Sequence, residues 1–363
     1  MSDTNFHLEI SREDYSRTRL LEEERTALSP GQVRFRIDRF ALTANNVTYA
    51  VFGDMLGYWD FFPTEAGWGR IPCMGWGEVI ESANPDVPTG GRYYGWFPLA
   101  QTIDMTVTAT GQGLRDDGEH RTAHAAPYRA YQASTVDPFY QEGSDAEDRH
   151  ALLRGIFVTG FLADDVFGDN DNYFGASYAV VLSASSKTGI AYATCAAKRG
   201  LKGVIGLTSP GNADFCSSIG CYDQILSYDD IDKLPTDGDA VVVDMAGNAA
   251  VLEKVHVQLG DRLKYSMMIG MSHHDSERST APSVGPAPEL FFAPTQMEKR
   301  AADWGPDGYR DRLAEAMFDF VADSRAWLTP QTLSGTAGTQ NAWDALIQGN
   351  VRPDKGQIVT LWD

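Results

Sequence analysis

Tyr178-Ala-Val-Val-Leu182 and the turn that follows it, Ser183-Ala-Ser-Ser-Lys-Thr-Gly189, form the stretch of this sequence that decides the fold. Residues compatible with a helix continue to Gly200, and a second apolar run follows at 203–208. This order predicts a strand, a tight turn of small residues, a helix and a second strand. Such a unit places a dinucleotide pyrophosphate at a helix N-terminus. The turn lacks the three glycines that usually build it, so the prediction depends on the rest of the chain.

The same alternation continues over residues 151–296. Short, nearly continuous apolar runs predict strands covered on both faces, as in a parallel sheet; they are 180–184, 203–208, 224–226, 240–244, 265–270 and 290–293. Helices are predicted over 189–199 and 249–259, each before a glycine, and over 310–327, where apolar residues share one face. This part is therefore predicted to be an α/β domain of the Rossmann type, a doubly wound parallel sheet.

The flanking residues predict a second, β-rich domain. Residues 31–110 are rich in glycine, aromatic and β-branched residues, alternate with period two at 33–37, and contain turn signals such as Gly90-Gly91. This pattern predicts a partly closed barrel. Residues 111–149 are polar and are interpreted as a long excursion or flap, and 357–361 as a closing strand. The expected domains are residues 1–150 with 297–363, and residues 151–296.

Composition limits the class of protein. The chain has 363 residues, enough for two domains, and a net charge of −20, which argues against a nucleic-acid partner. No apolar window approaches the ~20 residues that span a bilayer, and no signal peptide is recognised, so we expect a cytoplasmic protein with no membrane partner. The four cysteines show no CxxC spacing, so neither a disulfide framework nor a four-cysteine zinc site is expected.

Several segments carry, in order along nearly the whole chain, a resemblance to a known family. Ser29-Pro-Gly-Gln-Val-Arg-Phe-Arg-Ile37 is similar to an opening strand "PGEVLVRV", the turn at 183–189 stands in the position of "GAAGGVG", and Lys355-Gly-Gln-Ile-Val359 is similar to a closing "GKIV". The chain resembles the medium-chain dehydrogenase/reductase superfamily, and within it the zinc-free quinone-oxidoreductase and enoyl-reductase branch. The resemblance implies a Rossmann domain, a GroES-like β domain, a homodimer and NAD(P)H-dependent reduction of a small molecule.

The resemblance also implies which residues hold the cofactor: Ser185, Ser186, Lys187, Thr188, Gly189, Thr208, Ser209, Asn212, Tyr228, Ala246, Gly270 and Phe292. In such folds an acidic residue at the end of the second strand binds the ribose hydroxyls and disfavours a 2′-phosphate. Here that strand runs into Leu207-Thr-Ser-Pro-Gly-Asn212 with no carboxylate before Asp214. NADPH is therefore favoured over NADH. Lys187 could contact a phosphate or lie solvated at a helix start, and the two serines could bind pyrophosphate or cap the helix.

Zinc is not expected. Residues 43–49 contain no cysteine, and Met74-Gly-Trp-Gly-Glu78, where zinc-dependent relatives have "GHE", contains no histidine. Hydride transfer without a metal suits a C=C bond conjugated to a carbonyl, with hydrogen-bond donors that stabilise the developing enolate. Asn45, Asn46 and Tyr49 are the candidate donors. The alternative is that the two asparagines satisfy backbone groups in a tight loop and that Tyr49 belongs to the core.

Other side chains near these segments are candidates for the substrate site. Aromatic residues could line a pocket for a flat substrate or form ordinary core; they are Tyr58, Trp59, Trp68 and Trp76. His273 and His274, after the fifth predicted strand, could donate a proton or form a solvated pair. The leading hypothesis is an NADPH-dependent, zinc-independent reductase of an α,β-unsaturated carbonyl, quinone or aromatic ketone. The alternatives are a non-redox lyase acting on an aromatic metabolite, and a non-catalytic nucleotide-binding sensor or scaffold.

Overall fold

The structure is a computed structural model that describes residues 4–269 and 282–362. The chain divides into two compact units: unit 1 is Met1–Leu152 with Thr329–Asp363, and unit 2 is Leu153–Leu328. Within the two described ranges, no helix combines the length and the apolar character needed to cross a membrane.

Unit 2 is built around a six-stranded sheet in which all neighbouring strands are parallel. Its order, β12-β11-β10-β13-β14-β15, places the first strand at the centre, so the chain builds the sheet outward on one side and then on the other. The strands are β10 (Tyr178–Leu182), β11 (Val204–Thr208), β12 (Gln224–Ser227), β13 (Ala240–Asp244), β14 (Leu263–Met268) and β15 (Glu289–Leu290). The predicted doubly wound Rossmann fold is confirmed.

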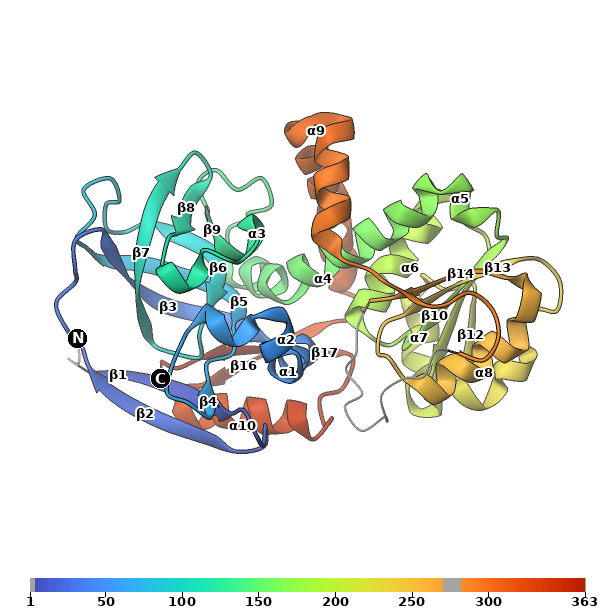
Figure 1. Ribbon diagram of the computed structural model, residues 1–363, viewed down its shortest axis with the longest axis horizontal. Coiled ribbons are helices and arrows are strands. Elements are labelled where there is room, and N and C mark those ends of the chain that lie inside the picture. Colours follow the sequence, from blue (N-terminus) through green and yellow to red (C-terminus); the bar gives the residue numbers. More distant parts are fainter. Residues whose placement is uncertain (1–3, 270–281, 363) are drawn as a thin grey trace. The chain divides into compact units, whose positions relative to one another are not determined.

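Successive residues of the central strands are buried on opposite faces of this sheet. Val181 and Val243 belong to a core that includes residues of α4 and α6, whereas Val180 and Val242 belong to a core that includes residues of α8. Burial on both faces explains why these strands are continuously apolar. Figure 1 shows the sheet among its helices. They are α4 (Ser144–Asp169), which begins in unit 1, α5 (Asp171–Phe174), α6 (Lys187–Arg199), α7 (Ala213–Ile219), α8 (Ala249–Leu259) and α9 (Ala293–Ser324). The short 3₁₀ turns are η3 (Pro210–Asn212), η4 (Tyr228–Lys233) and η5 (Gly260–Arg262).

Helix α9 is longer than the predicted helix over 310–327. Gly305, with φ of 75°, and Pro306 interrupt its regular backbone, and the helix continues on both sides of them. Its later part packs within unit 2, where the rings of Phe320 and Phe157 are stacked with centroids 4.9 Å apart. The chain therefore returns to unit 1 at Thr329 rather than at the predicted residue 297.

Unit 1 contains an eight-stranded sheet of order β16-β17-β3-β5-β6-β9-β8-β7. Strand β3 pairs with β7 as well as with β5, which closes the run from β3 to β7 into a barrel, as the predicted β-rich domain requires. The strands are β3 (Gln32–Leu42), β5 (Cys73–Ser82), β6 (Arg92–Phe97), β7 (Thr102–Thr110), β8 (Gly113–Asp116), β9 (Ala130–Ala133), β16 (Thr329–Ser334) and β17 (Lys355–Thr360).

The polar residues 111–149 are not a free excursion, in contrast to the interpretation of the sequence. Strand β8 pairs with β7 and β9, and β9 also pairs with β6, so this segment completes the barrel. The short turns η2 (Glu119–Arg121) and α3 (Ala126–Arg129) lie between the two strands. Both strands have four residues, too few to show an alternating pattern among their polar neighbours.

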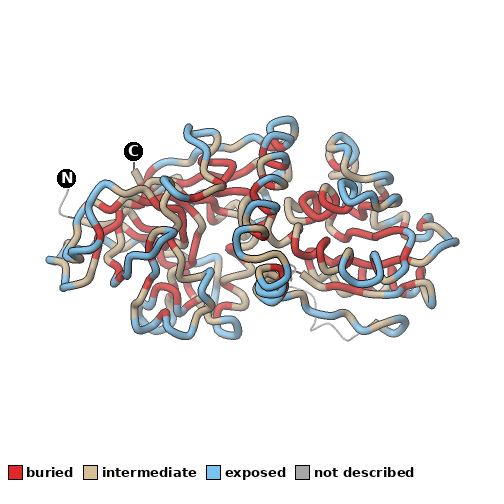
Figure 2. The backbone as a smooth tube through the Cα atoms, turned by 90° about the horizontal axis from the view of Figure 1, so that it is seen from above, coloured by how far each residue is buried: buried red, intermediate tan, exposed pale blue. Residues whose placement is uncertain are grey.

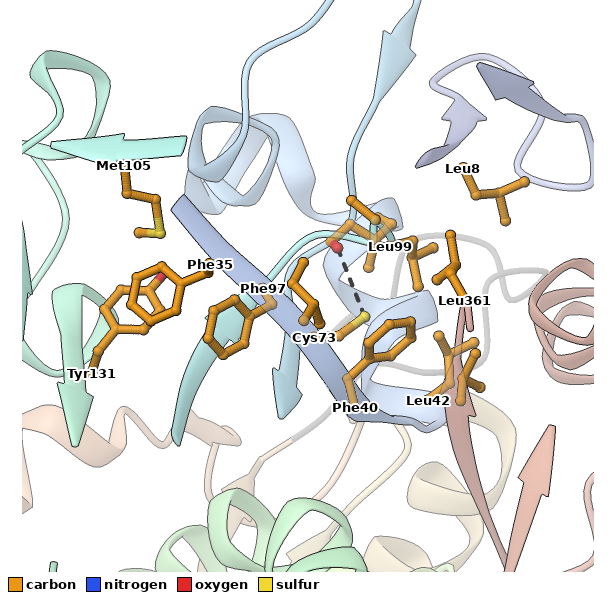
Figure 3. Packing of buried hydrophobic residues seen from close by; sticks show 14 of the residues in the cluster. Leu8, Phe35, Phe40, Leu42, Cys73, Phe97, Leu99, Met105, Tyr131 and Leu361 are labelled. Carbon is orange, nitrogen blue, oxygen red and sulfur yellow. Dashed lines mark hydrogen bonds between the residues drawn. The ribbon is translucent and has the colours of Figure 1, made fainter. Parts of the chain in front are cut away.

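Aromatic side chains fill the barrel (Figure 3). The ring of Tyr131, on β9, lies 5.6 Å from that of Phe35 on β3 and 5.2 Å from that of Phe97 on β6. All three residues are fully buried. In Figure 2 the buried segments run through the interior of each unit, and the exposed segments lie on its outside.

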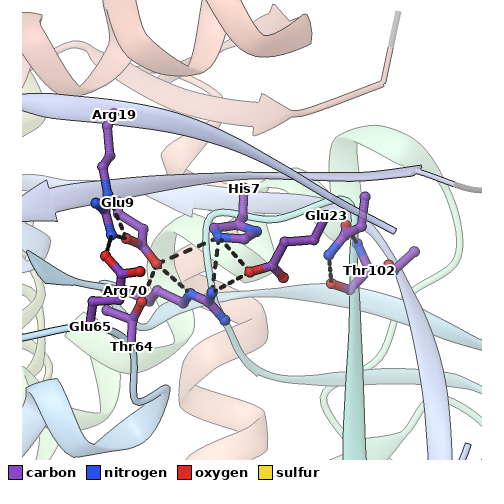
Figure 4. A network of polar contacts seen from close by, with 9 residues as sticks. His7, Glu9, Arg19, Glu23, Thr64, Glu65, Arg70 and Thr102 are labelled. Atoms are coloured by element: carbon purple, nitrogen blue, oxygen red, sulfur yellow. Dashed lines mark hydrogen bonds and ion pairs between the residues drawn. The ribbon is translucent and has the colours of Figure 1, made fainter. Parts of the chain in front are cut away.

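A smaller sheet of β1 (Thr4–Ser11), β2 (Thr18–Glu24) and β4 (Trp68–Gly69) completes unit 1 together with α10 (Gly335–Ile347). Glu9, on β1, is fully buried and receives hydrogen bonds from Arg19, Arg70 and Thr64 (Figure 4). Burial alone would raise the pKa of Glu9, but hydrogen bonds from these side chains and from His7 outweigh it and hold the pKa well below the usual 4.5. A buried carboxylate therefore joins β1 to the segments that carry Thr64 and Arg70.

Candidate active site

The turn after β10 carries only small side chains, residues 183–186, before α6 begins at Lys187. Ser183 has the left-handed φ of 59° that glycine usually provides. Ser186 is the N-cap of α6, and its hydroxyl accepts a hydrogen bond from the Gly189 amide at 3.0 Å. A Cβ atom at Gly189 would lie 3.0 Å from the Ser186 hydroxyl and 3.2 Å from the Ser183 carbonyl oxygen, so a larger residue there would disturb the cap. The positive end of a 13-residue helix dipole is thus left accessible behind small side chains.

Polar side chains from the next two strands meet this turn. The Asn212 amide donates to the Ser185 hydroxyl at 3.2 Å, and the hydroxyls of Ser183 and Tyr228 lie 3.2 Å apart. Asn212 follows β11 and Tyr228 follows β12, so both lie at the carboxyl edge of the parallel sheet, where doubly wound folds bind ligands. Four residues from three separate segments are therefore gathered around the N-terminus of α6.

The other predicted cofactor residues lie in different surroundings. Thr208 is buried, Ser209 and Thr188 are half-buried, and Lys187 is the first residue of α6. The Ala246 amide donates to the Asp244 carboxylate at 3.0 Å, so this backbone group shapes the turn after β13. Phe292, the N-cap residue of α9, is 53% exposed. Gly270, His273 and His274 lie outside the described residues.

In unit 1, the Asn46 side chain hydrogen-bonds nearby backbone groups. Its side-chain oxygen accepts a hydrogen bond from the Thr43 amide at 2.7 Å, completing a capping box at the start of α1 (Ala44–Val51). Its amide nitrogen donates to the carbonyl oxygen of Pro72 at 3.0 Å and faces the sulfur of Cys73 at 3.3 Å. The residue is only 3% exposed. Asn46 therefore fixes α1 to the strand β5, and its amide is already satisfied.

Asn45 and Tyr49 lie together on the outer side of the same helix. They are four residues apart, which places their side chains on one face of α1. Both residues are half-buried. Burial raises the pKa of Tyr49 well above its usual value of 10. The tyrosine is thus neutral across the physiological range and can donate a hydrogen bond.

Tyr49 belongs to a set of rings that we call the aromatic group: Tyr49, Tyr58, Phe61, Trp96 and Tyr128. The ring centroids of Tyr49 and Tyr58 are 4.4 Å apart and stacked, and Trp96 meets Tyr49 edge-on at 5.7 Å. Phe61 follows Tyr58 in η1 (Tyr58–Phe61), after the short helix α2 (Gly53–Leu56). Sequence reasoning missed Trp96 and Tyr128 because they come from β6 and α3, which no local pattern connects to α1.

The three tryptophans proposed for the substrate site are core residues or lie against an arginine. Trp59 and Trp76 are buried core residues, 4% and 0% exposed, and Trp68 stacks against Arg19. The indole N–H of Trp76 donates to the Glu147 carbonyl oxygen at 3.1 Å. Within the described part of the chain, no group of three or more His, Cys, Asp or Glu side chains could hold a metal ion.

Comparison with known proteins agrees with this architecture. A family model described as "Protein of unknown function (DUF2855)" matches residues 40–352. The chain belongs to this family. No curated protein matches this DUF2855 chain by sequence.

Solved structures match the DUF2855 chain over nearly its whole length. A putative NADPH:quinone reductase from Mesorhizobium loti has a TM-score of 0.65 and 13% identity, covering 99% of both chains. CurA from Vibrio vulnificus in complex with NADPH has 0.62 and 12%, again with 99% of both chains. The yhdH oxidoreductase from Salmonella enterica in complex with NADP has 0.57 and 16%, covering 98% of this chain and 99% of that one. The recognition of a medium-chain dehydrogenase/reductase fold is confirmed.

The two neighbouring asparagines should respond differently to substitution. We expect Asn46→Ala to lower the free energy of unfolding by about 2–3 kcal/mol, because it removes several buried hydrogen bonds. Asn45→Ala, the matched control for stability, should change it by less than about 0.5 kcal/mol, as expected for a partly exposed side chain. Urea unfolding followed by circular dichroism measures both values. Equal losses for the two variants would contradict the roles given to them here.

Proposed function

We propose that this protein is a zinc-independent, NADPH-dependent oxidoreductase that reduces an α,β-unsaturated carbonyl, a quinone or an aromatic ketone. The observation that carries the proposal is the low turn of Ser183–Lys187 at the N-terminus of α6, at the carboxyl edge of the central strand. This position suits a pyrophosphate because backbone amides and the helix dipole both favour negative charge. The chain's net charge of −20 makes such local donors necessary for any anionic cofactor.

The residues present fit such a cofactor, and they favour a 2′-phosphate. Ser185 and Asn212 are hydrogen-bonded to each other beside the turn, and Ser209 lies between them in the chain at the end of β11. No carboxylate follows β11 before Asp214, which belongs to α7. Hydroxyl and amide donors can accommodate a phosphate, which a carboxylate would repel. When bound, the nicotinamide supplies a hydride.

Unit 1 would bind the substrate through α1. The Asn45 amide and the neutral Tyr49 hydroxyl can hydrogen-bond a substrate carbonyl oxygen and stabilise the negative charge that develops on it. The half-buried rings of the aromatic group, all except that of Phe61, offer faces for a planar substrate. Trp76, fully buried and bonded through its indole, fills the segment in which relatives carry a zinc-binding histidine, which supports chemistry without zinc.

The similar structures support the same proposal. Three of them, named above as a quinone reductase, an oxidoreductase with NADP and a protein in complex with NADPH, share this fold. At 12–16% identity they support the class of chemistry and the cofactor without indicating which carbonyl compound this chain reduces.

Cofactor binding gives the direct test. Fluorescence titration should show NADPH binding more tightly than NADH, and Asn212→Asp should weaken NADPH binding about tenfold, or ~1.4 kcal/mol, because a carboxylate would face the 2′-phosphate. The affinity for NADH should not fall. Asn350→Asp, an exposed site in unit 1, adds the same charge and should leave both affinities unchanged.

Two results would oppose this proposal. No binding of either nucleotide at millimolar concentration would exclude a reductase, and tighter binding of NADH would exclude the preference for NADPH. Turnover without consumption of reduced cofactor would favour the lyase alternative instead.

We also propose a homodimer that forms through β15. Among the residues that the structure describes, this strand is the edge of the sheet in unit 2, and such an edge can pair with another strand. Leu290 on it is 63% exposed, and Phe292 just beyond is 53% exposed. A second copy could bury both residues by a two-fold pairing.

Light scattering tests the dimer. The wild-type protein should have twice the mass of the chain, and Leu290→Asp should shift it toward the monomer, because the substitution places a charge in the paired edge. Val257→Asp, at a residue that is 56% exposed on α8, is the control and should stay dimeric. A monomeric wild-type protein would contradict the proposal.

A further inference from the structure

The segment between β8 and β9 is fastened to the barrel by a buried arginine. Arg121 is 0% exposed; its Nε donates to the Asp116 carboxylate at 3.1 Å, and its Nη2 donates to the Tyr128 carbonyl oxygen. The guanidinium lies over the ring of Phe61, 3.8 Å from its centroid. Burying a cation is costly unless it is paired, and here the pairing fixes the backbone of Tyr128 relative to Phe61.

His124 provides a second attachment of the same segment. Its Nε2 lies 2.9 Å from the carbonyl oxygen of Gly57, the residue before Tyr58. Because a carbonyl oxygen only accepts, the His124 Nε2 carries the proton. The imidazole also packs edge-on against the ring of Phe61, with centroids 4.5 Å apart. Two independent contacts therefore hold the segment against residues 57–61.

These contacts bring Tyr128 into the aromatic group. Its ring meets those of Tyr58 at 6.2 Å, Trp96 at 5.6 Å and Phe61 at 5.7 Å, each approximately edge-on. Tyr128 is half-buried, as are Tyr58 and Tyr49, so the three phenols form part of an accessible surface.

Tyr58, which contacts Tyr128, also packs against Tyr49. Their rings are stacked at 4.4 Å with an interplanar angle of 29°, so a rotation of Tyr58 would remove the face on which Tyr49 rests. The contacts thus run continuously from the buried Arg121 through Tyr128 and Tyr58 to the residue expected to donate to the substrate.

We propose that Tyr128 is a positioning residue of the substrate site, which acts through Tyr58 to hold Tyr49 in the orientation that donates to the carbonyl oxygen. This inference rests on the proposed function. The segment 116–129 thereby has a role in the reaction as well as in closing the barrel. The relevant contacts are the edge-on packing of the Tyr128 ring against Tyr58 and Trp96, so removal of the ring should change the rate about five- to tenfold.

Kinetics of three variants test this positioning. Tyr128→Leu removes the edge-on ring contacts and keeps an apolar side chain, so kcat should fall about five- to tenfold while KM changes by less than about twofold. Tyr58→Leu should have a similar effect. If Tyr128 acts through Tyr58, the double variant should be no slower than either single variant. Tyr140→Leu, which removes a ring that packs edge-on against Trp76 elsewhere in unit 1, is the matched control and should keep its kcat.

A second readout does not require activity. In protein labelled with 3-fluorotyrosine, the ¹⁹F resonance that Tyr49→Phe removes identifies Tyr49. That resonance should shift in Tyr128→Leu, and Tyr128→Leu should add no further shift in the Tyr58→Leu background.

The outcomes separate the two proposals. Additive losses of kcat, or an unchanged kcat in Tyr128→Leu, would overturn the positioning role. An unmoved Tyr49 resonance would overturn it even if no substrate were turned over. Absence of any turnover by the wild-type protein, with the Tyr49 resonance shifting as expected, would instead contradict the proposed function alone.

Discussion

The path of the chain out of β10 is the constraint on which unit 2 depends. The strand is buried on both faces at the centre of a parallel sheet, and the chain has to turn directly into α6. Ser183 takes the left-handed conformation, Ser186 caps the helix, and Gly189 leaves room for that cap. The usual glycines are largely replaced, yet the geometry that leaves a helix N-terminus accessible is kept. The serine hydroxyls also reach the ends of β11 and β12 through Asn212 and Tyr228.

The sequence predicted unit 2 well because strands buried on both faces are continuously apolar, and this pattern is visible in the sequence. Continuous apolar runs identified the central strands, and Gly200 and Gly260 marked the ends of α6 and α8. Helix α9 was predicted too short, since Gly305 and Pro306 indicate a helix end while packing within unit 2 continues the helix past them. A local sequence pattern does not show that packing within unit 2 compensates for Gly305 and Pro306.

Unit 1 was harder to predict in detail because its organisation depends on contacts between distant segments. The four-residue strands β8 and β9 lie in a polar stretch, and only their pairing shows that they complete the barrel. The candidate site shows the same limit at single residues. Asn45 and Asn46 are equivalent in sequence, but the helical period turns one toward Tyr49 and the other toward the backbone of Pro72. The position of Tyr128 beside these residues could not be predicted, because it depends on the contacts that Arg121 and His124 make with distant segments.

Hydrogen–deuterium exchange with and without NADPH tests the central claim most directly, that the turn after β10 holds a dinucleotide. The account predicts slower exchange of backbone amides in residues 184–190 and 208–212 when NADPH is present, because a pyrophosphate at the N-terminus of α6 would bond these amides and order the loop beside them. Unchanged exchange in both segments at a saturating NADPH concentration, or protection confined to other parts of the chain, would contradict it.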